Sequence, residues 1–218
     1  MTANDFYTSP LARSAALVLI DVQRDFLDIP GGDAPMPVDG VRAAIPAMAK
    51  LATAFRERGL PIVHAVRLYR QDGSNVDPVR RLLVEQGARI AAPGSAGSQI
   101  AAELLANVVE LDYELLLAGG FQHVGTAEHV MYKPRWGAFS DTNLDRHLRE
   151  SGSNTLVFAG CNVPNCPRTS IYEASEPDFR IVLVSDGMSG LYDRGIEECR
   201  AIGVDVRNLS ETLDWLAC

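Results

Sequence analysis

Two kinds of hydrophobic pattern alternate along the chain: short, nearly unbroken apolar runs, and longer segments in which apolar residues recur every three or four positions. Unbroken runs are typical of strands buried on both faces of a parallel sheet, and the second spacing is typical of amphipathic helices. The runs predict strands at 15–21, 60–67, 154–160, 179–185 and 203–207, and a further short strand or extended arm at 114–118. The helical spacing predicts helices at 41–59, 79–86, 98–105, 140–152, 168–175, 193–202 and 210–216.

The alternation of strands and helices predicts an α/β fold, in which two layers of helices enclose an open, mostly parallel, Rossmann-like sheet of six strands. The chain contains no internal repeat, low-complexity tract or linker, so residues 1–218 are expected to form a single domain. In such sheets, ligands bind at the carboxyl ends of the strands. Asp21, Arg67 and the segment 161–166 follow predicted strands, and we therefore expect them to lie close together.

The composition and sequence of the chain argue against several classes of binding partner. The chain carries a formal net charge of −8 and no basic run, so binding to nucleic acid is not expected. The apolar runs are shorter than the roughly 20 residues that span a bilayer, and residues 1–13 lack the pattern of a secretory signal. We therefore expect a cytoplasmic protein with no membrane partner. No G-x-G-x-x-G pattern follows the first strand, which argues against a dinucleotide-binding dehydrogenase.

Cys166 is a candidate nucleophile because of its position in the sequence. It directly precedes Pro167, and proline is favoured in the first turn of a helix, so the thiol is expected at or beside a helix N-terminus. The positive end of a helix lowers the pKa of a thiol, and the thiolate is the reactive form. The alternative is that Cys166 is a small buried hydrophobic residue.

Asp21 and Lys133 are candidate partners for such a thiol. Asp21 ends an apolar strand, so its carboxylate is expected at the sheet edge, either as a proton acceptor or as a helix cap or ion-pair partner. Lys133 is one of two lysines in a chain with 18 arginines, which indicates a need for an ammonium group at this position. The alternative is an ordinary solvated lysine.

Three segments of the chain together resemble a known family. VLIDVQRDF (18–26), KPRWGAFSDTNL (133–144) and AGCNVPNCPRTSIYEA (159–174) are similar to the three motif blocks of the isochorismatase-like cysteine hydrolases, in the same order and across nearly the whole chain. The third block resembles a CNVPNCPRT-type subgroup. The resemblance implies the isochorismatase fold and a catalytic triad of Asp21 as acid and base, Lys133, and Cys166 as nucleophile.

The same resemblance implies a reaction. The sulfur attacks the carbonyl carbon of a small amide, ureido or carbamoyl compound, an amine leaves with a proton from Asp21, and water hydrolyses the thioester. The backbone N–H groups of Asn162 and Cys166 match the family's oxyanion hole, next to a cis peptide bond between Cys161 and Asn162.

We predict no metal and no other cofactor. Nicotinamidase-type members of the family hold a metal with an Asp-x-His pattern, whereas Asp33 is followed here by Ala34 and Pro35. The four histidines show no spacing typical of metal ligands, and His64, within a predicted strand, is expected to be a hydrogen-bonded core residue.

Five side chains are predicted to shape the substrate pocket. Phe26 and Trp136 follow the catalytic acid and lysine closely enough to form walls, while Arg67, Tyr69 and Tyr172 supply polar contacts. An inward-pointing Arg67 favours a substrate with a carboxylate or polar carbonyl. The alternatives are a subunit-interface ion pair for Arg67, a core position for Trp136 and helix packing for Tyr172.

Other functions stay open at this point. Some family members lack the cysteine and cleave a vinyl ether, and the retained Cys166 argues instead for hydrolysis of a C–N bond. Hydrolysis of esters or lactams, and a non-catalytic binding or assembly role, are the remaining alternatives. By analogy with the family, a homo-oligomer, dimer or tetramer, is expected.

Overall fold

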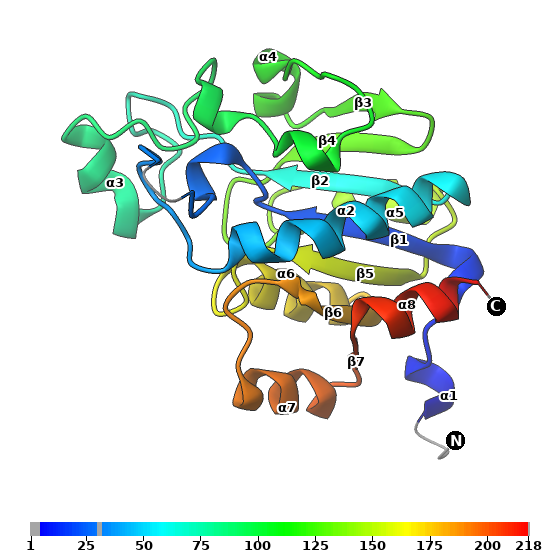
Figure 1. Cartoon of the computed structure of the whole chain (residues 1–218). Coiled ribbons are helices and arrows are strands. Elements are labelled where there is room, and N and C mark those ends of the chain that lie inside the picture. The colour runs from blue at the N-terminus through cyan, green and yellow to red at the C-terminus, as the bar shows by residue number, and fades with distance from the viewer. Residues whose placement is uncertain (1–4, 30–31, 218) are drawn as a thin grey trace.

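The centre of the protein is one seven-stranded sheet, in a computed structural model that describes residues 5–29 and 32–217 (Figure 1). The strand order is β3-β4-β2-β1-β5-β6-β7, and every pair is parallel except β3 and β4. The strands are β1 (Ala15–Ile20), β2 (Ile62–Val66), β3 (Phe121–Gly125), β4 (Glu128–Tyr132), β5 (Thr155–Gly160), β6 (Arg180–Met188) and β7 (Asp205–Arg207). The prediction of an α/β fold with a mostly parallel sheet is confirmed, but the predicted number of six strands is wrong.

The error in the strand count lies in the segment between residues 113 and 132. Tyr113–Leu117 forms helix α4, whose first turn is capped by Asp112, so the strand or arm predicted at 114–118 is wrong. The antiparallel pair β3 and β4 was not predicted. None of the residues of β3 is buried, because it is an edge strand, and the apolar run of β4 is interrupted by Glu128 and His129. Neither strand therefore shows the unbroken apolar run that marks a central parallel strand.

Helices cover both faces of the sheet. Leu17 and Leu19 of β1 point toward the layer that contains α2 and α8, whereas Val18 and Ile20 point toward the layer that contains α5, α6 and α7. In Figure 1, α2 and α8 lie in front of the sheet. The helices are α1 (Asp5–Thr8), α2 (Val41–Glu57), α3 (Pro78–Glu85), α4 (Tyr113–Leu117), α5 (Leu144–Glu150), α6 (Cys166–Ser175), α7 (Asp193–Ala201) and α8 (Leu209–Leu216).

Two predicted helices differ from the structure. Residues 98–105 form no α-helix: one 3₁₀ turn ends at Ser98 and another spans Ala102–Leu104. Between them, Ile100 pairs with Gln23 in an isolated bridge and the Ala101 N–H donates to the carbonyl of Val22. The helix predicted at 140–152 begins later, at Leu144. Asp141 has a φ of 55°, a left-handed conformation that a helix does not accommodate.

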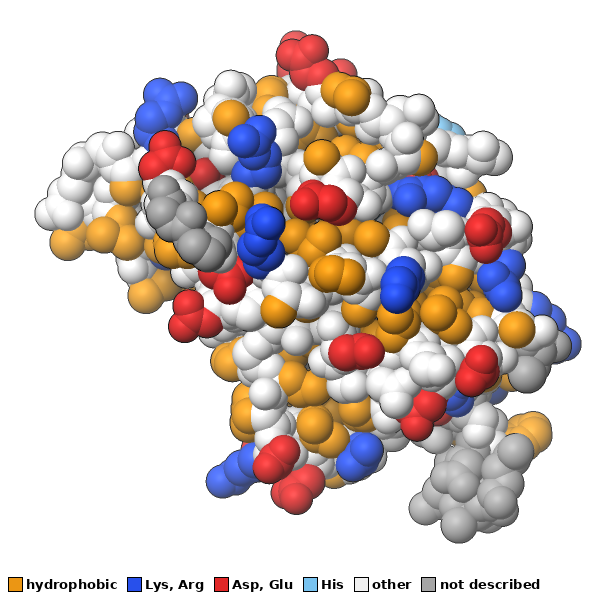
Figure 2. Space-filling view, viewed as in Figure 1, with side chains coloured by type: hydrophobic (Ala, Val, Ile, Leu, Met, Phe, Trp, Pro, Cys, Tyr) orange, Lys and Arg blue, Asp and Glu red, His pale blue; other side chains and the backbone are white. Residues whose placement is uncertain are grey.

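On the outer face of the molecule where α2 and α8 lie, acidic and basic side chains are interspersed (Figure 2). In the part of the chain that the structure describes, no helix is both long and apolar enough to cross a bilayer.

Candidate active site

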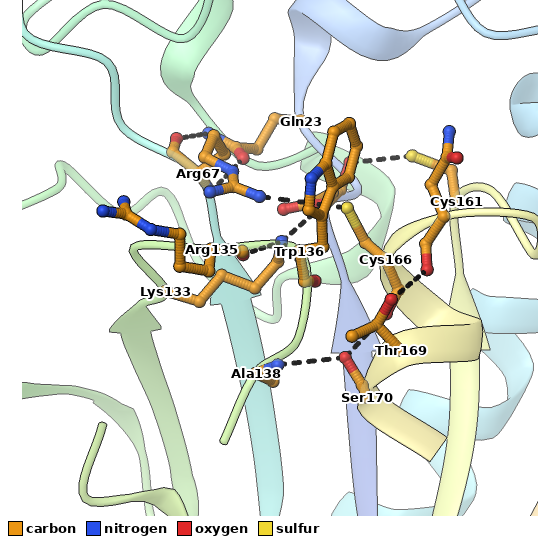
Figure 3. Close-up of polar contacts among 12 residues, drawn as sticks. Gln23, Arg67, Lys133, Arg135, Trp136, Ala138, Cys161, Cys166, Thr169 and Ser170 are labelled. Carbon is orange, nitrogen blue, oxygen red and sulfur yellow. Dashed lines mark hydrogen bonds and ion pairs between the residues drawn. The ribbon is translucent and has the colours of Figure 1, made fainter. Parts of the chain in front are cut away.

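Four neighbouring strands end at the same edge of the sheet, and each is followed by a residue of interest. Asp21 follows β1, Arg67 follows β2, Lys133 follows β4 and Cys161 follows β5. Helix α6 then begins with Cys166. The side chains of Lys133, Arg67 and Cys166 point toward one another (Figure 3). The parallel topology therefore brings together residues that are more than 100 positions apart in the sequence.

Lys133 and Asp21 form a buried ion pair. Nζ of Lys133 lies 2.9 Å from Oδ2 of Asp21 and also donates to the carbonyl oxygens of Arg135, at 3.2 Å, and Trp136, at 3.1 Å. The lysine is completely buried, and three acceptors satisfy the three donors of its ammonium group. Oδ1 of Asp21 has no hydrogen-bond partner among the described residues. One carboxylate oxygen is thus held by the lysine and the other is free to take a proton.

The Cys166 thiol lies beside this pair and close to a third charge. Its Sγ atom is 4.0 Å from Nη2 of Arg67, whose side chain is 1% exposed, and the cysteine itself is 5% exposed. Burial, and then the negative charge of Asp21, raises the pKa of the thiol to about 11, against the opposing charges of Lys133 and Arg67. The predicted lowering of this pKa is therefore wrong: burial and the charge of Asp21 raise it. The thiol is therefore protonated at neutral pH and needs a base to react.

The turn before α6 leaves two backbone donors unused. The peptide bond between Cys161 and Asn162 is cis. Within this turn, the N–H of Val163 donates to Ser189 and the N–H of Asn165 donates to Asn162. The N–H groups of Asn162 and Cys166, in contrast, donate to no other residue that the structure describes. These are the two donors that the sequence resemblance assigns to an oxyanion hole.

Buried polar side chains that the sequence analysis missed fix the catalytic segments in place. Gln23 is fully buried, and its amide donates to the carbonyl of Arg67 at 2.9 Å and accepts from the Arg67 N–H at 2.7 Å. Ser170 bonds the carbonyl of Cys166 at 2.7 Å and accepts from the N–H of Ala138 at 3.1 Å (Figure 3). The loop that carries Lys133 is thereby attached to the helix that carries Cys166. A polar residue two positions after a buried strand was the available signal for Gln23.

The structure brings together four of the five residues predicted to shape the pocket. The guanidinium carbon of Arg67 lies 5.5 Å from the ring centre of Tyr69 and 5.9 Å from that of Trp136. Phe26 joins this group through Arg80, as described below. Tyr172 does not join it. Its ring is 36% exposed on α6, and the guanidinium of Arg168 lies 5.7 Å from its centre.

The structure also shows where the histidines lie. His64 is buried and hydrogen-bonds to Glu128 at 2.7 Å, as expected for a core residue. His129 lies between His123 and His147, with ring centres 4.2 and 4.6 Å away, a cluster that the sequence analysis missed because three separate elements supply it. Burial, and then the neighbouring histidines, lowers the pKa of His129 to about 4. Across residues 5–29 and 32–217, no group of three or more Asp, Glu, His or Cys side chains is arranged to hold a metal ion.

An open α/β sheet with a carboxylate, an ammonium and a thiol at its carboxyl edge defines a class of α/β proteins with an acid–lysine–cysteine site. The model of the isochorismatase domain matches residues 15–111 and 120–208, and the chain therefore belongs to the isochorismatase family. It is an isochorismatase-family hydrolase.

Three relatives illustrate the range of similar proteins. An isochorismatase family protein from Desulfovibrio vulgaris is 31% identical, with a TM-score of 0.79 over 94% of this chain and 100% of that one. A probable inactive nicotinamidase of Arabidopsis thaliana is 27% identical over 94% of this chain and 97% of its own. A ureidoacrylate amidohydrolase, RutB, of Azorhizobium caulinodans is 27% identical over 82% of this chain and 77% of its own.

Proposed function

We propose that the protein is a cysteine-dependent hydrolase that cleaves a C–N bond of a small amide, ureido or carbamoyl compound through a thioester on Cys166. The observation that carries this proposal is the buried cluster formed by the protonated thiol of Cys166 and the Asp21–Lys133 ion pair, in which Oδ1 of Asp21 has no hydrogen-bond partner among the described residues. The resemblance of the third motif block to the CNVPNCPRT-type subgroup supports membership of that subgroup as part of the proposal. No metal and no other cofactor takes part.

The first step is the formation of a carbon–sulfur bond. Asp21 takes the thiol proton through Oδ1 as Sγ attacks the carbonyl carbon of the substrate, so a free thiolate is never required. Lys133 and Arg67 stabilise the negative charge that develops on the sulfur, since both lower the pKa of this thiol. A raised thiol pKa therefore suits a mechanism in which proton transfer and attack occur together.

The carbonyl oxygen becomes an oxyanion during this attack. The unpaired N–H groups of Asn162 and Cys166 are available to donate to it, without first breaking hydrogen bonds within the protein. Each donor of this kind contributes about 10²- to 10³-fold to the rate in other acyl-transfer enzymes.

The remaining steps return the enzyme to its starting state. The protonated Asp21 gives its proton to the leaving nitrogen as the C–N bond breaks, and ammonia or an amine departs. Asp21 then accepts a proton from water, which attacks the thioester carbonyl. The carboxylic acid product leaves, and the sulfur regains its proton.

The surroundings of the thiol and the relatives both favour amide chemistry. Arg67 supplies buried donors, and Phe26 and Trp136 supply apolar walls, as a small amide with a polar carbonyl or carboxylate requires. The Azorhizobium relative is a ureidoacrylate amidohydrolase. The Arabidopsis relative, a probable inactive nicotinamidase, favours the non-catalytic alternative, whereas the intact set of Asp21, Lys133 and Cys166 argues against it. A cytoplasmic homo-oligomer, dimer or tetramer, is part of the proposal.

Ammonia release from a panel of small amides, ureido acids and carbamoyl compounds tests this function. The wild-type protein and Cys199→Ala are expected to release ammonia from the same compounds at the same rate, since Cys199 lies on α7. Cys166→Ala is expected to lose activity by at least about 10³-fold while staying folded. Full activity of Cys166→Ala would exclude covalent catalysis, and hydrolysis of a vinyl ether or an ester panel alone would favour the corresponding alternative.

A further inference from the structure

Helix α3 turns one arginine toward the candidate active site. The guanidinium carbon of Arg80 lies 5.0 Å from the ring centre of Trp136, 5.9 Å from that of Phe26 and 6.0 Å from that of Tyr69. Two of these rings are the proposed walls of the substrate pocket. Arg80 was not a candidate in the sequence analysis, because α3 contributes no motif.

The orientation of α3 is unusual for a surface helix. Its apolar residues Val79, Leu82 and Leu83 are exposed, by 72%, 62% and 44%, and the half-buried Arg80 lies against the rings of Trp136 and Phe26. Hydrophobic side chains are visible on the surface at the left edge of Figure 2, where α3 lies. An amphipathic surface helix ordinarily buries its apolar side and leaves its charges in water. The apolar residue of α3 that is buried is Val84, one turn after Arg80 on the same side of the helix, so the inward face of α3 combines one apolar residue with Arg80.

A buried network holds Arg80 in this position. The hydroxyl group of Tyr69 donates to Oδ2 of Asp77 at 2.6 Å and accepts from Nη1 of Arg80 at 3.2 Å. Nη1 of Arg67 lies 3.4 Å from the same Asp77 oxygen. Asp77 is 2% exposed and directly precedes α3, so its carboxylate contacts Arg67 directly and Arg80 through the hydroxyl group of Tyr69.

The charges of this region do not balance. Lys133 pairs with Asp21 and Arg67 pairs with Asp77, whereas the guanidinium of Arg80 has the Tyr69 hydroxyl group, and no carboxylate, as its polar partner among the described residues; the Cys166 thiol is neutral. Buried charges are unfavourable unless they are paired. A single negative charge in the pocket would complete the pairing.

Arg67 shows where part of that charge belongs. Its Nε atom has no hydrogen-bond partner among the described residues, and Nη1 makes no hydrogen bond beside its 3.4 Å ion pair with Asp77, although the side chain is 99% buried. Buried donors without a hydrogen bond are rare, because each costs the loss of its hydration. A planar guanidinium with free donors next to a reactive thiol is suited to the paired oxygens of a carboxylate.

We propose that Arg80, together with Arg67, binds a carboxylate of the substrate, so that the enzyme selects amides that carry a negative charge. This inference rests on the proposed function and names the substrate class. Arg80 determines specificity by contact with the substrate, while Tyr69 and Asp77 are positioning residues that act through it. The scissile carbonyl lies at Cys166, and the carboxylate lies on the side of Trp136 where the two guanidinium groups meet.

Matched pairs of amides measure this selection. Each pair contains a carboxylate and its neutral carboxamide: malonamate and malonamide, succinamate and succinamide, and N-carbamoylglycine and N-carbamoylglycinamide. The wild-type protein is expected to prefer the charged member of the best pair. In Arg80→Gln, kcat/KM for the charged member should fall by about 10- to 100-fold, mainly through KM, and that for the neutral member by less than about twofold. Arg80→Lys should restore part of the loss.

Arg81→Gln is the matched control, because it removes the same charge from the next position of α3, where the side chain is exposed. It should leave both members of each pair unchanged. Equal losses for charged and neutral amides in Arg80→Gln would indicate a merely structural role and overturn the proposal. A wild-type preference for the neutral amides would also overturn it.

A binding assay separates failure of this inference from failure of the proposed function. Iodoacetamide labelling of Cys166 is followed at pH 9 in the presence of succinate or of succinamide. Succinate should slow labelling of the wild-type protein and Arg81→Gln, but less so that of Arg80→Gln, even if no amide is hydrolysed. Equal protection by the two compounds, or no protection by either, would overturn the carboxylate site and leave the proposed chemistry of Cys166 standing.

Discussion

Strand β4 carries a buried charged cluster at each end, and the two clusters differ in how completely their polar atoms are bonded. At the start of the strand, Oε1 of Glu128 lies 2.6 Å from Nη2 of Arg56 and 2.7 Å from Nε2 of His64, and Oε2 accepts from Nε of Arg56 at 2.7 Å. At its end, Lys133 pairs with Asp21, but Asp21 Oδ1 and two nitrogens of Arg67 have no hydrogen-bond partner in the described chain.

This difference separates a cluster that serves the fold from one that serves a reaction. A buried carboxylate with both oxygens bonded is fully explained by the folded protein, since every lost contact with water is replaced. Free donors and a free acceptor around a thiol are unfavourable for the folded protein alone. They are explained if a substrate supplies the missing partners.

The largest expected effect comes from replacing the carboxylate of each cluster by an amide and comparing the activities of the two variants. Asp21→Asn keeps an oxygen for Lys133 but removes the base, so amide hydrolysis should fall by about 10³-fold. The buried Lys133 also loses its counter-charge, so the free energy of unfolding should fall as well. Glu128→Gln should keep hydrolysis within about threefold of wild type, because Glu128 does not contact the thiol. Steady-state kinetics and urea unfolding of both variants check this. An active Asp21→Asn protein would remove the distinction between the clusters.

The next effect concerns stability. Glu128→Ala leaves His64 and the half-buried Arg56 without their shared acceptor, which should lower the free energy of unfolding by about 2 to 3 kcal/mol. Asp145→Ala is a suitable control, because its ion pair with Arg149 is exposed and contributes at most about 0.5 kcal/mol. Equal unfolding midpoints for the two variants would show that the Glu128 cluster does not stabilise the fold.

The fold shows which strands the hydrophobic pattern of the sequence can predict and which it cannot. β1 and β5 were predictable because they are central strands, and their unbroken apolar runs follow directly from burial on both faces. β4 was not, because its first residue, Glu128, is buried only with the help of Arg56 and His64, which lie on α2 and β2. A pattern read along one segment contains no information on partners that another segment supplies.

The residues of the candidate active site also divide into those that the sequence identifies and those that it does not. Asp21, Lys133 and Cys166 each lie in a contiguous motif, so the sequence named them. Arg80 and Asp77 lie outside these motifs, and their roles depend on which face of α3 turns inward. The pKa of Cys166 was predicted in the wrong direction because the helix N-terminus is visible in the sequence, whereas the burial of the thiol is not.

The pH dependence of stability should distinguish the two carboxylate clusters further. Although burial opposes it, hydrogen bonds from Arg56 and His64 hold the pKa of Glu128 at about 2, below its ordinary value of 4.5. A lowered pKa in the folded state means that the stabilisation is complete above pH 4.5 and is lost as the pH falls toward 2. Urea unfolding between pH 6 and pH 3 should therefore show a shallower acid loss for Glu128→Gln than for wild type. Parallel curves would contradict the role of Glu128.

The smallest effect is a shift in the labelling profile of one thiol. Because burial raises the pKa of Cys166 to about 11, its labelling by iodoacetamide in the absence of substrate should keep rising with pH through 10. Lys133→Met removes a cation that lowers this pKa, so its profile should shift further to alkaline pH. Mass spectrometry of the peptide containing Cys166 gives the rates. A labelling rate that is constant above pH 7 would indicate a preformed thiolate and contradict the need for Asp21 as a base.

The central claim is that substrate becomes attached to Cys166, and rapid acid quenching during turnover tests it most directly. Intact mass and peptide mapping of the quenched protein should show a mass increase equal to the acyl part of the amide, located on Cys166 and absent from Cys166→Ala. An acyl group on a different residue, or hydrolysis of the same amide by Cys166→Ala at the wild-type rate, would contradict the account.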